Sequence, residues 1–364
     1  MPVWLDSPDV LRQRIAAWPA MGIDRIGLDT EFVRERTYWP QLALVQIAAG
    51  EDILLVDPLV PGMTAALRSM LDEAALLKVM HSASEDLVAF KHACGALPAP
   101  LFDTQIAAAL AGVGGGLGYQ KLVQAITGVT LAKGETRSDW MRRPLSGSQL
   151  EYAADDVLHL DAVYRELDAK LSVLGRLDWL HADGARLVAG VASDEPERWP
   201  HLSLRSAQFL DPDEQRLLLR LLRWRDVQAR ASDKPRSWII DNELAVELVR
   251  KPPADEAALQ AWLDARPKSP RKLAARLWQA LSTPLPDEAD APLARVADDA
   301  EKKKLKRLQD AVGQRSSELG LPDGVLASRR WLEALIEAHA TGDWPEALGG
   351  WRREQLQPLL TPLL

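Results

Sequence analysis

Two acidic residues interrupt an apolar stretch near the start of the chain, in the sequence IGLDTEF at residues 26–32. The stretch predicts a β-strand, and successive side chains of a strand point to opposite faces. Asp29 and Glu31 therefore share one face. Two neighbouring carboxylates repel each other unless a cation or solvent separates them, so the pair suits a hard divalent metal ion. A solvated acidic edge is the alternative that this pair alone leaves open.

A second candidate group is HSASED at residues 81–86, where a strand of apolar character runs into a predicted helix. Asp86 falls in the first turn of that helix, where the backbone N–H groups and the helix dipole favour an anion. This position also accounts for an acid that has no chemical role. His81 could bind a metal ion or contact substrate, although a histidine at a strand end also serves as a hydrogen-bonded structural residue.

A third candidate group is EYAADD at residues 151–156, within a predicted helix. Tyr152 and Asp156 are four residues apart and so lie on one helical face. A phenol and a carboxylate placed in this way can hold one water between a metal ion and a substrate. Asp155 is three residues from Tyr152 and suits the same face, so spacing alone does not choose between the two acids. A solvated helix surface is the alternative.

Three arginines, Arg137, Arg142 and Arg143, lie near the end of the same half of the chain and could contact substrate phosphates. Solvated surface is an equally good interpretation of each. The glycine-rich segment 112–118 lacks the spacing of a nucleotide-phosphate loop, so we expect a flexible connection beside the site.

Together the three acidic groups resemble the DEDD 3′–5′ exonucleases, and within them the tyrosine-bearing branch to which ribonuclease D belongs. That family carries Asp-x-Glu on a first strand, a His-x-Ala-x-x-Asp pattern, and Tyr-x-x-x-Asp on a late helix. The family spacing selects Asp156 over Asp155. Further segments are similar to ribonuclease D and occur in the same order, at residues 29–34, 38–42, 102–105, 137–140 and 151–154.

The resemblance implies a set of roles for these residues. Asp29 would bridge two divalent ions, Mg²⁺ or Mn²⁺, with Glu31 and Asp156 on the water-activating ion and Asp86 on the other. Two such ions can activate a water and stabilise the leaving oxygen of a phosphodiester. Tyr152 would position the attacking water rather than act as a strong base, because a phenol with a pKa near 10 is protonated at neutral pH.

The elements that must position these residues are those of an α/β domain with a mixed sheet, and the resemblance implies a ribonuclease H-like exonuclease fold. Strands are predicted at 26–33, 41–48, 52–56 and 77–80. A helix should begin at Ser7 and Pro8, and another should run from Ser84 to Gly95. The longest helix of this half should run from Ser146 to about Leu171.

The second half of the chain is predicted to be helical and is punctuated by prolines. We expect an exonuclease domain at 1–200 and two small helical domains at 201–292 and 293–364. The first resembles the HRDC domain, a helical nucleic-acid-binding module, and the second aligns weakly with the first at an offset of 87 residues. Two basic runs, Arg216 to Arg225 and Lys302 to Arg307, could neutralise phosphates or form solvated helix faces.

Composition limits the remaining choices. The 364-residue chain has one cysteine, Cys94, which excludes a disulfide framework and favours a reducing cytoplasm. It has no predicted signal peptide and no run long enough to span a membrane. The formal net charge of −8 argues at first against a nucleic-acid binder. However, residues 1–200 carry −9 and residues 201–364 carry +1, so the acidity belongs to the half with the proposed metal ligands.

These observations predict a metal-dependent 3′–5′ exoribonuclease that releases 5′ monophosphates. As the resemblance implies, its partner would be RNA with a free 3′ end, and maturation of tRNA precursors would be its task. No membrane and no protein partner is implied. A DNA exonuclease of the same fold is the first alternative. A nucleic-acid-binding protein whose acidic cluster no longer cuts is the second.

Overall fold

The computed structural model describes residues 2–132, 134–135, 138–339 and 342–364. Contacts within the chain divide it into two compact units. Unit 1 comprises residues 1–33, 41–193 and 298–364, and unit 2 comprises residues 34–40 and 194–297. The division into three domains at residues 200 and 292 stays a prediction.

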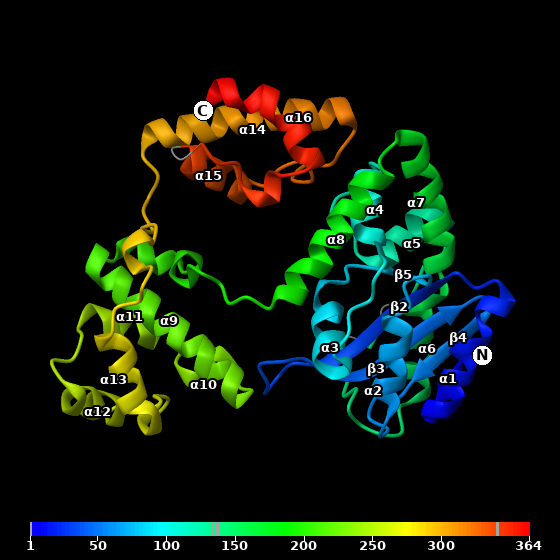
Figure 1. Ribbon diagram of the computed structural model, residues 1–364, viewed down its shortest axis with the longest axis horizontal. Coiled ribbons are helices and arrows are strands. Elements are labelled where there is room, and N and C mark those ends of the chain that lie inside the picture. Colours follow the sequence, from blue (N-terminus) through cyan, green and yellow to red (C-terminus); the bar gives the residue numbers. More distant parts are fainter. Residues whose placement is uncertain (1, 133, 136–137, 340–341) are drawn as a thin grey trace. The chain divides into compact units, whose positions relative to one another are not determined.

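A mixed sheet with the strand order β1-β4-β3-β2-β5-β6 forms the N-terminal part of unit 1 (Figure 1). Antiparallel pairs join β2 to β3 and β3 to β4, and parallel pairs join β2 to β5, β5 to β6 and β1 to β4. The strands are β1 (Val3–Leu5), β2 (Arg25–Val33), β3 (Gln41–Ala49), β4 (Asp52–Val56), β5 (Leu77–Met80) and β6 (Leu101–Asp103). The four predicted strands are confirmed. β1 and β6 were not predicted, because three residues are too few to show an alternating pattern.

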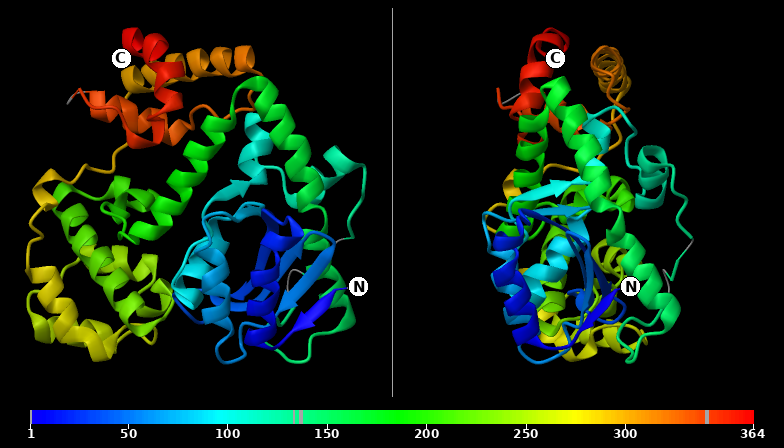
Figure 2. Two further views of the ribbon diagram at one scale, coloured as in Figure 1. Left: turned by 45° about the vertical axis from the view of Figure 1, so that its right-hand side comes forward. Right: turned by 90° about the vertical axis from the view of Figure 1, so that its right-hand side faces the viewer.

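Helices cover both faces of the sheet, which buries the apolar side chains of each face (Figure 2). One face packs against α1 (Pro8–Ala17), α2 (Met63–Leu71) and α3 (Ser84–Cys94). The other face packs against α6 (Gly147–Leu158) and α7 (Leu160–Leu174). The remaining helices of this part are α4 (Thr104–Leu110), α5 (Tyr119–Thr127), α8 (Leu177–Ser193) and the 3-10 helix η1 (Pro19–Met21).

The helix predicted from Ser146 to about Leu171 is in fact two helices, so that prediction is wrong. Ser146 does begin α6, because its hydroxyl accepts from the backbone of Gln149 and the Gln149 side chain binds back to Ser146. The chain then turns at His159, whose backbone N–H donates to the hydroxyl of Tyr119 at 3.3 Å. A donor used in this way is lost to the helical hydrogen-bond ladder, and α7 starts a new helix.

Residues 298–364 of unit 1 are helical and pack on α8. Trp179 of α8 stacks on Trp351, with ring centroids 4.2 Å apart. Arg352 donates to both oxygens of the buried Asp183, at 2.5 and 2.7 Å. The elements of this segment are α14 (Asp299–Leu319), α15 (Arg329–Ala338), α16 (Trp351–Leu360), η7 (Glu346–Leu348) and η8 (Thr361–Leu363). In the described residues, no helix has both the length and the apolar character that crossing a membrane requires.

Unit 2 is helical apart from the loop at residues 34–40, which connects β2 to β3. Its α-helices are α9 (Pro212–Ser232), α10 (Arg236–Ile239), α11 (Asn242–Arg250), α12 (Glu256–Asp264) and α13 (Ala274–Ser282). Its 3-10 helices are η2 (Pro200–Ser203), η3 (Arg205–Phe209), η4 (Arg271–Leu273) and η5 (Glu288–Asp290). Apolar side chains of α9, α11, α12 and α13 form its core. The expected end of β signals after about residue 178 is confirmed in the described part of the chain.

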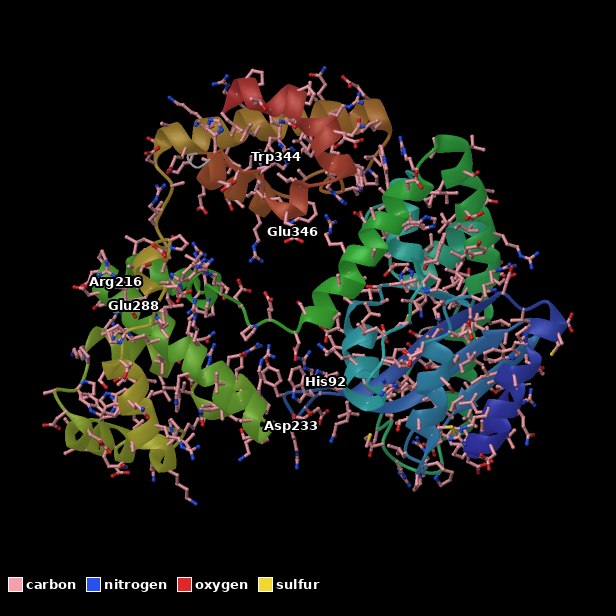
Figure 3. All side chains as sticks on the ribbon, viewed as in Figure 1. His92, Arg216, Asp233, Glu288, Trp344 and Glu346 are labelled. Atoms are coloured by element: carbon pink, nitrogen blue, oxygen red, sulfur yellow. The ribbon has the colours of Figure 1, made fainter. Side chains whose placement is uncertain are left out.

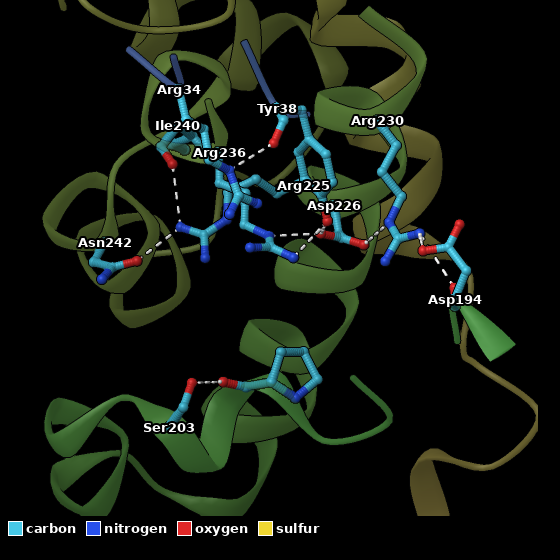
Figure 4. Close-up of polar contacts among 11 residues, drawn as sticks. Arg34, Tyr38, Asp194, Ser203, Arg225, Asp226, Arg230, Arg236, Ile240 and Asn242 are labelled. Atoms are coloured by element: carbon cyan, nitrogen blue, oxygen red, sulfur yellow. Dashed lines mark hydrogen bonds and ion pairs between the residues drawn. The ribbon is translucent and has the colours of Figure 1, made fainter. Parts of the chain in front are cut away.

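The loop at residues 34–40 is tied to α9 by a buried polar network (Figure 4). The hydroxyl of Tyr38 donates to Asp226 at 2.9 Å, and the same carboxylate accepts from Arg230 at 2.8 Å and from Arg236 at 2.6 Å. The backbone N–H of Tyr38 also donates to Asp233, at the end of α9. This loop therefore belongs structurally to the helical unit, although it lies between two strands of the sheet in the sequence.

Candidate active site

Asp29 and Glu31 lie on β2 beyond the point where its neighbour β5 ends. The last paired residues of these two strands are Gly27 and Val79, so the sheet is open beside the two acids. Thr30, between them, is buried and points to the opposite face, where its hydroxyl donates to the carboxylate of Asp86. The alternation of the strand thus supplies two acids on one side and a hydroxyl that holds a third acid on the other.

Asp86 is buried in the first turn of α3, as predicted. The turn before this helix is held by Asp103, whose carboxylate accepts from the backbone N–H groups of Ser82 at 3.2 Å and Ala83 at 2.8 Å. Asp103 also accepts from the backbone N–H of Gln105 and so caps α4. Asp103 fixes the backbone that carries Asp86.

Tyr152 and Asp156 lie on one face of α6, and each side chain contributes to the pKa shift of the other. The charge of Asp156 acts on both Asp29 and Glu31, which places it beside the acids of β2. Asp155 acts on Asp156 but is not among the charges that perturb those two strand residues. These charge interactions favour Asp156 over Asp155 as the neighbour of the strand acids, and the choice between them stays a prediction.

The four carboxylates hold protons more tightly than isolated acids do. Burial is the main cause for each, and it raises the pKa of Glu31 to about 8 and those of Asp86 and Asp156 to about 7. The pKa of Asp29 is raised well above its usual value by burial and then by the charges of the other three acids. Bound cations would neutralise the unfavourable negative charge of this cluster, so the cluster favours cation binding electrostatically.

The donor set fits a hard divalent ion, because all four groups offer carboxylate oxygens. Within the described residues, no three acidic, histidine or cysteine side chains converge closely enough to enclose one ion. Thr30 holds one oxygen of Asp86 by a hydrogen bond.

The raised pKa values predict that the metal-free protein loses stability as the pH rises. The unfolded acids ionise near pH 4, whereas the folded ones stay protonated up to about pH 7 to 8, so their contribution is present at low pH and lost across this interval. We expect the melting temperature in EDTA to fall between pH 5 and pH 8.5, and Mn²⁺ to restore it chiefly above pH 7. Scanning fluorimetry across this range tests the prediction. A metal effect as large at pH 5 as at pH 8 would contradict it.

His81 lies close to this cluster, with both of its ring nitrogens engaged. Nδ1 is 2.9 Å from the hydroxyl of Thr104, and Nε2 is 3.1 Å from the carbonyl oxygen of Leu117. Burial lowers the pKa of the imidazole, so the neutral ring is favoured. In this arrangement His81 holds the glycine-rich loop against the start of α4, and a contact with substrate stays a prediction.

The three candidate arginines differ. Arg143 is used internally, because it donates to both oxygens of Asp57 at 2.7 Å and to the carbonyl oxygen of Ala43 at 2.6 Å. Arg142 is exposed, and a contact with substrate phosphate stays a prediction. Arg137 lies outside the described residues.

The glycine-rich segment 112–118 contacts other parts of unit 1 through some of its residues. Gly112 has a φ of +72°, and a Cβ there would lie 2.7 Å from the carbonyl oxygen of Gly320. Leu117 accepts from His81 and also from the amide of Gln105 at 2.9 Å. Glycine allows the close approach of residues 112 and 320 because it has no Cβ. The flexibility expected of the segment stays a prediction.

The sequence analysis missed Tyr119, which begins α5 directly after the glycine-rich segment. Its pKa is raised by burial and, to a lesser extent, by the charges of Asp156 and Asp29, so its hydroxyl lies near the acids. The same hydroxyl accepts from His159 and helps to end α6. No local pattern identifies Tyr119, since its partners come from other helices and strands.

The basic run on α9 is mostly used within unit 2. Arg220 forms an ion pair with Glu288, Arg223 forms one with Asp287, and Arg225 donates to Asn242 at 2.7 Å. Arg216 lies close enough to Glu288 to lower the pKa of that carboxyl further (Figure 3). These arginines hold the helices of unit 2 together, which the sequence alone could not distinguish from a phosphate-binding surface.

Comparison with known proteins identifies the family. Residues 3–172 match a family model described as 3′-5′ exonuclease. The chain is 66% identical to ribonuclease D of Xanthomonas oryzae pv. oryzae, covering 100% of this chain and 99% of that protein. It is 37% identical to ribonuclease D of Pseudomonas paraeruginosa, covering 99% and 97% respectively.

A solved structure agrees over the same length. The crystal structure of Escherichia coli RNase D, described as an exoribonuclease involved in structured RNA processing, superposes with a TM-score of 0.86 at 30% identity. The match covers 100% of this chain and 98% of that one. Because both the sequence match and the structural match extend over the helical half as well as the sheet that carries the acids, this chain belongs to the ribonuclease D family of 3′–5′ exonucleases.

Proposed function

We propose that this enzyme hydrolyses the last phosphodiester bond at the 3′ end of RNA with two divalent ions, Mg²⁺ or Mn²⁺, and releases 5′ monophosphates. The observation that carries the proposal is the cluster of four mutually repelling carboxylates from β2, α3 and α6. When bound, the two ions would neutralise the phosphate, acidify the attacking water and stabilise the leaving oxygen.

The protein side chains would divide the work of holding these ions. Asp29 would bridge both, because its charge interacts with those of all three other acids. Glu31 and Asp156 would bind the ion on the water side, and Asp86, held by Thr30, would bind the ion on the leaving-group side. This assignment follows the family pattern and agrees with the elements from which the four side chains come.

Tyr152 would orient the attacking water. Burial is the main cause that raises the pKa of its phenol further above 10, and the neighbouring acids add to it, so the hydroxyl keeps its proton at neutral pH. The phenol shares one face of α6 with Asp156 and interacts with it, so it would hold a water beside that carboxylate. It contributes position and not basicity.

Tyr152→Phe should lose most turnover while keeping its metal ions, because only the orientation of the water is removed. Loss of a positioned group of this kind costs about 10²- to 10⁴-fold in rate. Single-turnover cleavage of RNA measures the loss, and Mn²⁺ titration measures the retained binding. If the variant binds Mn²⁺ as weakly as Asp29→Asn does, Tyr152 supports the metal site instead.

The substrate would be RNA with a free 3′ end, and maturation of tRNA 3′ ends would be the task. RNA is supported by the two relatives, which are ribonucleases D, and by the Escherichia coli protein, which is an exoribonuclease. The helical segments 201–292 and 293–364 would be HRDC-like modules that add affinity for nucleic acid. The cytoplasmic location expected from the single cysteine belongs to the same proposal.

A direct competition between nucleic acids tests the substrate. RNA and DNA oligonucleotides of the same sequence and length are given to the enzyme with Mg²⁺, and their shortening is followed on gels. We expect the RNA to shorten faster, one nucleotide at a time from its 3′ end, and a 3′-phosphate to block it. Faster loss of the DNA would favour the DNA exonuclease. Cleavage of neither would favour a binding protein without activity.

A further inference from the structure

Gln46 is a fully buried polar side chain in the middle of β3. Neither its amide nitrogen nor its amide oxygen has a hydrogen-bond partner among the described residues. Burying polar atoms without partners costs free energy, and most buried polar atoms in native proteins are bonded. A site that keeps such an amide therefore calls for an explanation from its surroundings.

The strand register places Gln46 beside the acidic cluster. In the antiparallel pair of β2 and β3, Gln46 is the residue directly opposite Asp29. Residues directly opposite each other project to the same face, with Cβ atoms about 4.5 to 5.5 Å apart. On its other side Gln46 is opposite Leu55 of β4, which packs with Ala153 of α6. The amide is thus enclosed between the strand that carries Asp29 and the helix that carries Asp156.

Asp29 has little support of its own in this arrangement. A hydrogen bond from the backbone of Thr30 favours its charge, while burial and three neighbouring acids oppose that charge. A carboxylate that binds metal ions is commonly oriented by a hydrogen bond from a neighbouring group. The amide of Gln46 is a neutral donor on the residue directly opposite Asp29. It would break no other hydrogen bond by donating to this carboxylate, because it has no partner among the described residues.

We propose that Gln46 is a positioning residue for the metal site: when the ions are bound, its Nε2–H, which has no partner among the described residues, donates to the carboxylate of Asp29 and fixes the rotamer in which that carboxylate holds the ions. The inference rests on the proposed metal-binding role of Asp29. It explains why the interior keeps an amide where an apolar side chain would cost less. It also explains how Asp29 can turn to the ions without a charged partner.

The test compares two buried glutamines. Gln46→Met keeps the length of the side chain and removes both polar atoms. Gln215→Met is the matched control, because Gln215 is equally buried but donates to the carbonyl oxygens of Leu210 at 3.0 Å and Ala294 at 2.9 Å in unit 2. Melting temperature in EDTA, Mn²⁺ affinity by calorimetry, and kcat and KM on RNA are measured for each, with Gln46→Leu as a second variant.

We expect Gln46→Met to melt in EDTA at or above the temperature of the parent, yet to bind Mn²⁺ about 10- to 100-fold more weakly. Its kcat should fall while KM for RNA changes little. Gln215→Met should melt at a lower temperature and bind Mn²⁺ normally. Mn²⁺ affinity within twofold of the parent in both Gln46 variants would overturn the inference and leave the metal site intact. If the parent binds no more Mn²⁺ than Asp29→Asn does, the proposed function itself fails.

Discussion

Asp156→Asn is expected to lower turnover on RNA by about 10³-fold, whereas Asp155→Asn, one residue away, should change it by less than about threefold. A metal ligand that stabilises charge in the transition state contributes several kcal/mol, and about 4 kcal/mol corresponds to this ratio. The charge of Asp156 raises the pKa values of Asp29 and Glu31, whereas that of Asp155 raises the pKa of Asp156. Single-turnover rates on one RNA oligonucleotide measure both variants.

The neighbouring variant makes this comparison specific. Both substitutions remove one negative charge from the same turn of α6, so a general loss of charge or of helix stability would affect the two alike. An Asp156→Asn enzyme as active as its parent would contradict the metal assignment and favour a protein that binds nucleic acid without cutting it. Inactivity of Asp155→Asn alone would exchange the roles of the two acids.

Asp226→Ala should destabilise unit 2 by about 1 to 3 kcal/mol, because the carboxylate is buried while the arginines that bind it are partly exposed. The carboxylate accepts from Tyr38, Arg230 and Arg236, and it is 8% exposed. Burial by itself would raise the pKa of Asp226, but the bonds from Arg236 and Tyr38 hold it below its usual value. Removing this anion takes the ion-pair partner from Arg236 and one of two partners from Arg230, which keeps Asp194. The loop at residues 34–40 loses one of its anchors and keeps the bond from Tyr38 to Asp233.

Urea denaturation followed by tryptophan fluorescence measures this loss, and hydrogen exchange at residues 34–40 locates it. Asp213→Ala is the control, because its ion pair with Arg216 is exposed and should be worth less than about 1 kcal/mol. Tyr38→Phe, which removes one hydroxyl of the same network, should fall between the two. Equal stability of the Asp226 and Asp213 variants would show that the network does not hold the loop.

The candidate site was predictable where its chemistry is local. Asp29 and Glu31 share a face because a strand alternates, and Tyr152 and Asp156 share a face because a helix turns once in about 3.6 residues. Asp86 could be placed at a helix start from the pattern around it, and the structure confirms that position. These placements depend only on residues within a few positions of each other.

Other features depend on partners that are distant in the sequence. Arg143 is used within the protein because Asp57, which is distant in the sequence, lies beside it and accepts its hydrogen bonds. Arg220 and Arg223 of α9 form ion pairs because residues 287 and 288 lie next to that helix. The break at His159 follows from Tyr119, which lies forty residues earlier. The residues that surround each of these side chains in the sequence do not show whether such a distant partner is present.

The sequence by itself determined where the four main strands lie along the chain, that the second half is helical, and how the acids are spaced. It could do so because backbone periodicity and the repulsion between carboxylates act over a few residues. Only the tertiary structure decided that β5 ends beside Asp29, that Gln46 lies opposite it without a partner, and that residues 34–40 belong to the helical unit. The physical reason is that strand register and the pairing of buried charges are set by packing between distant segments, whose energies no local pattern contains.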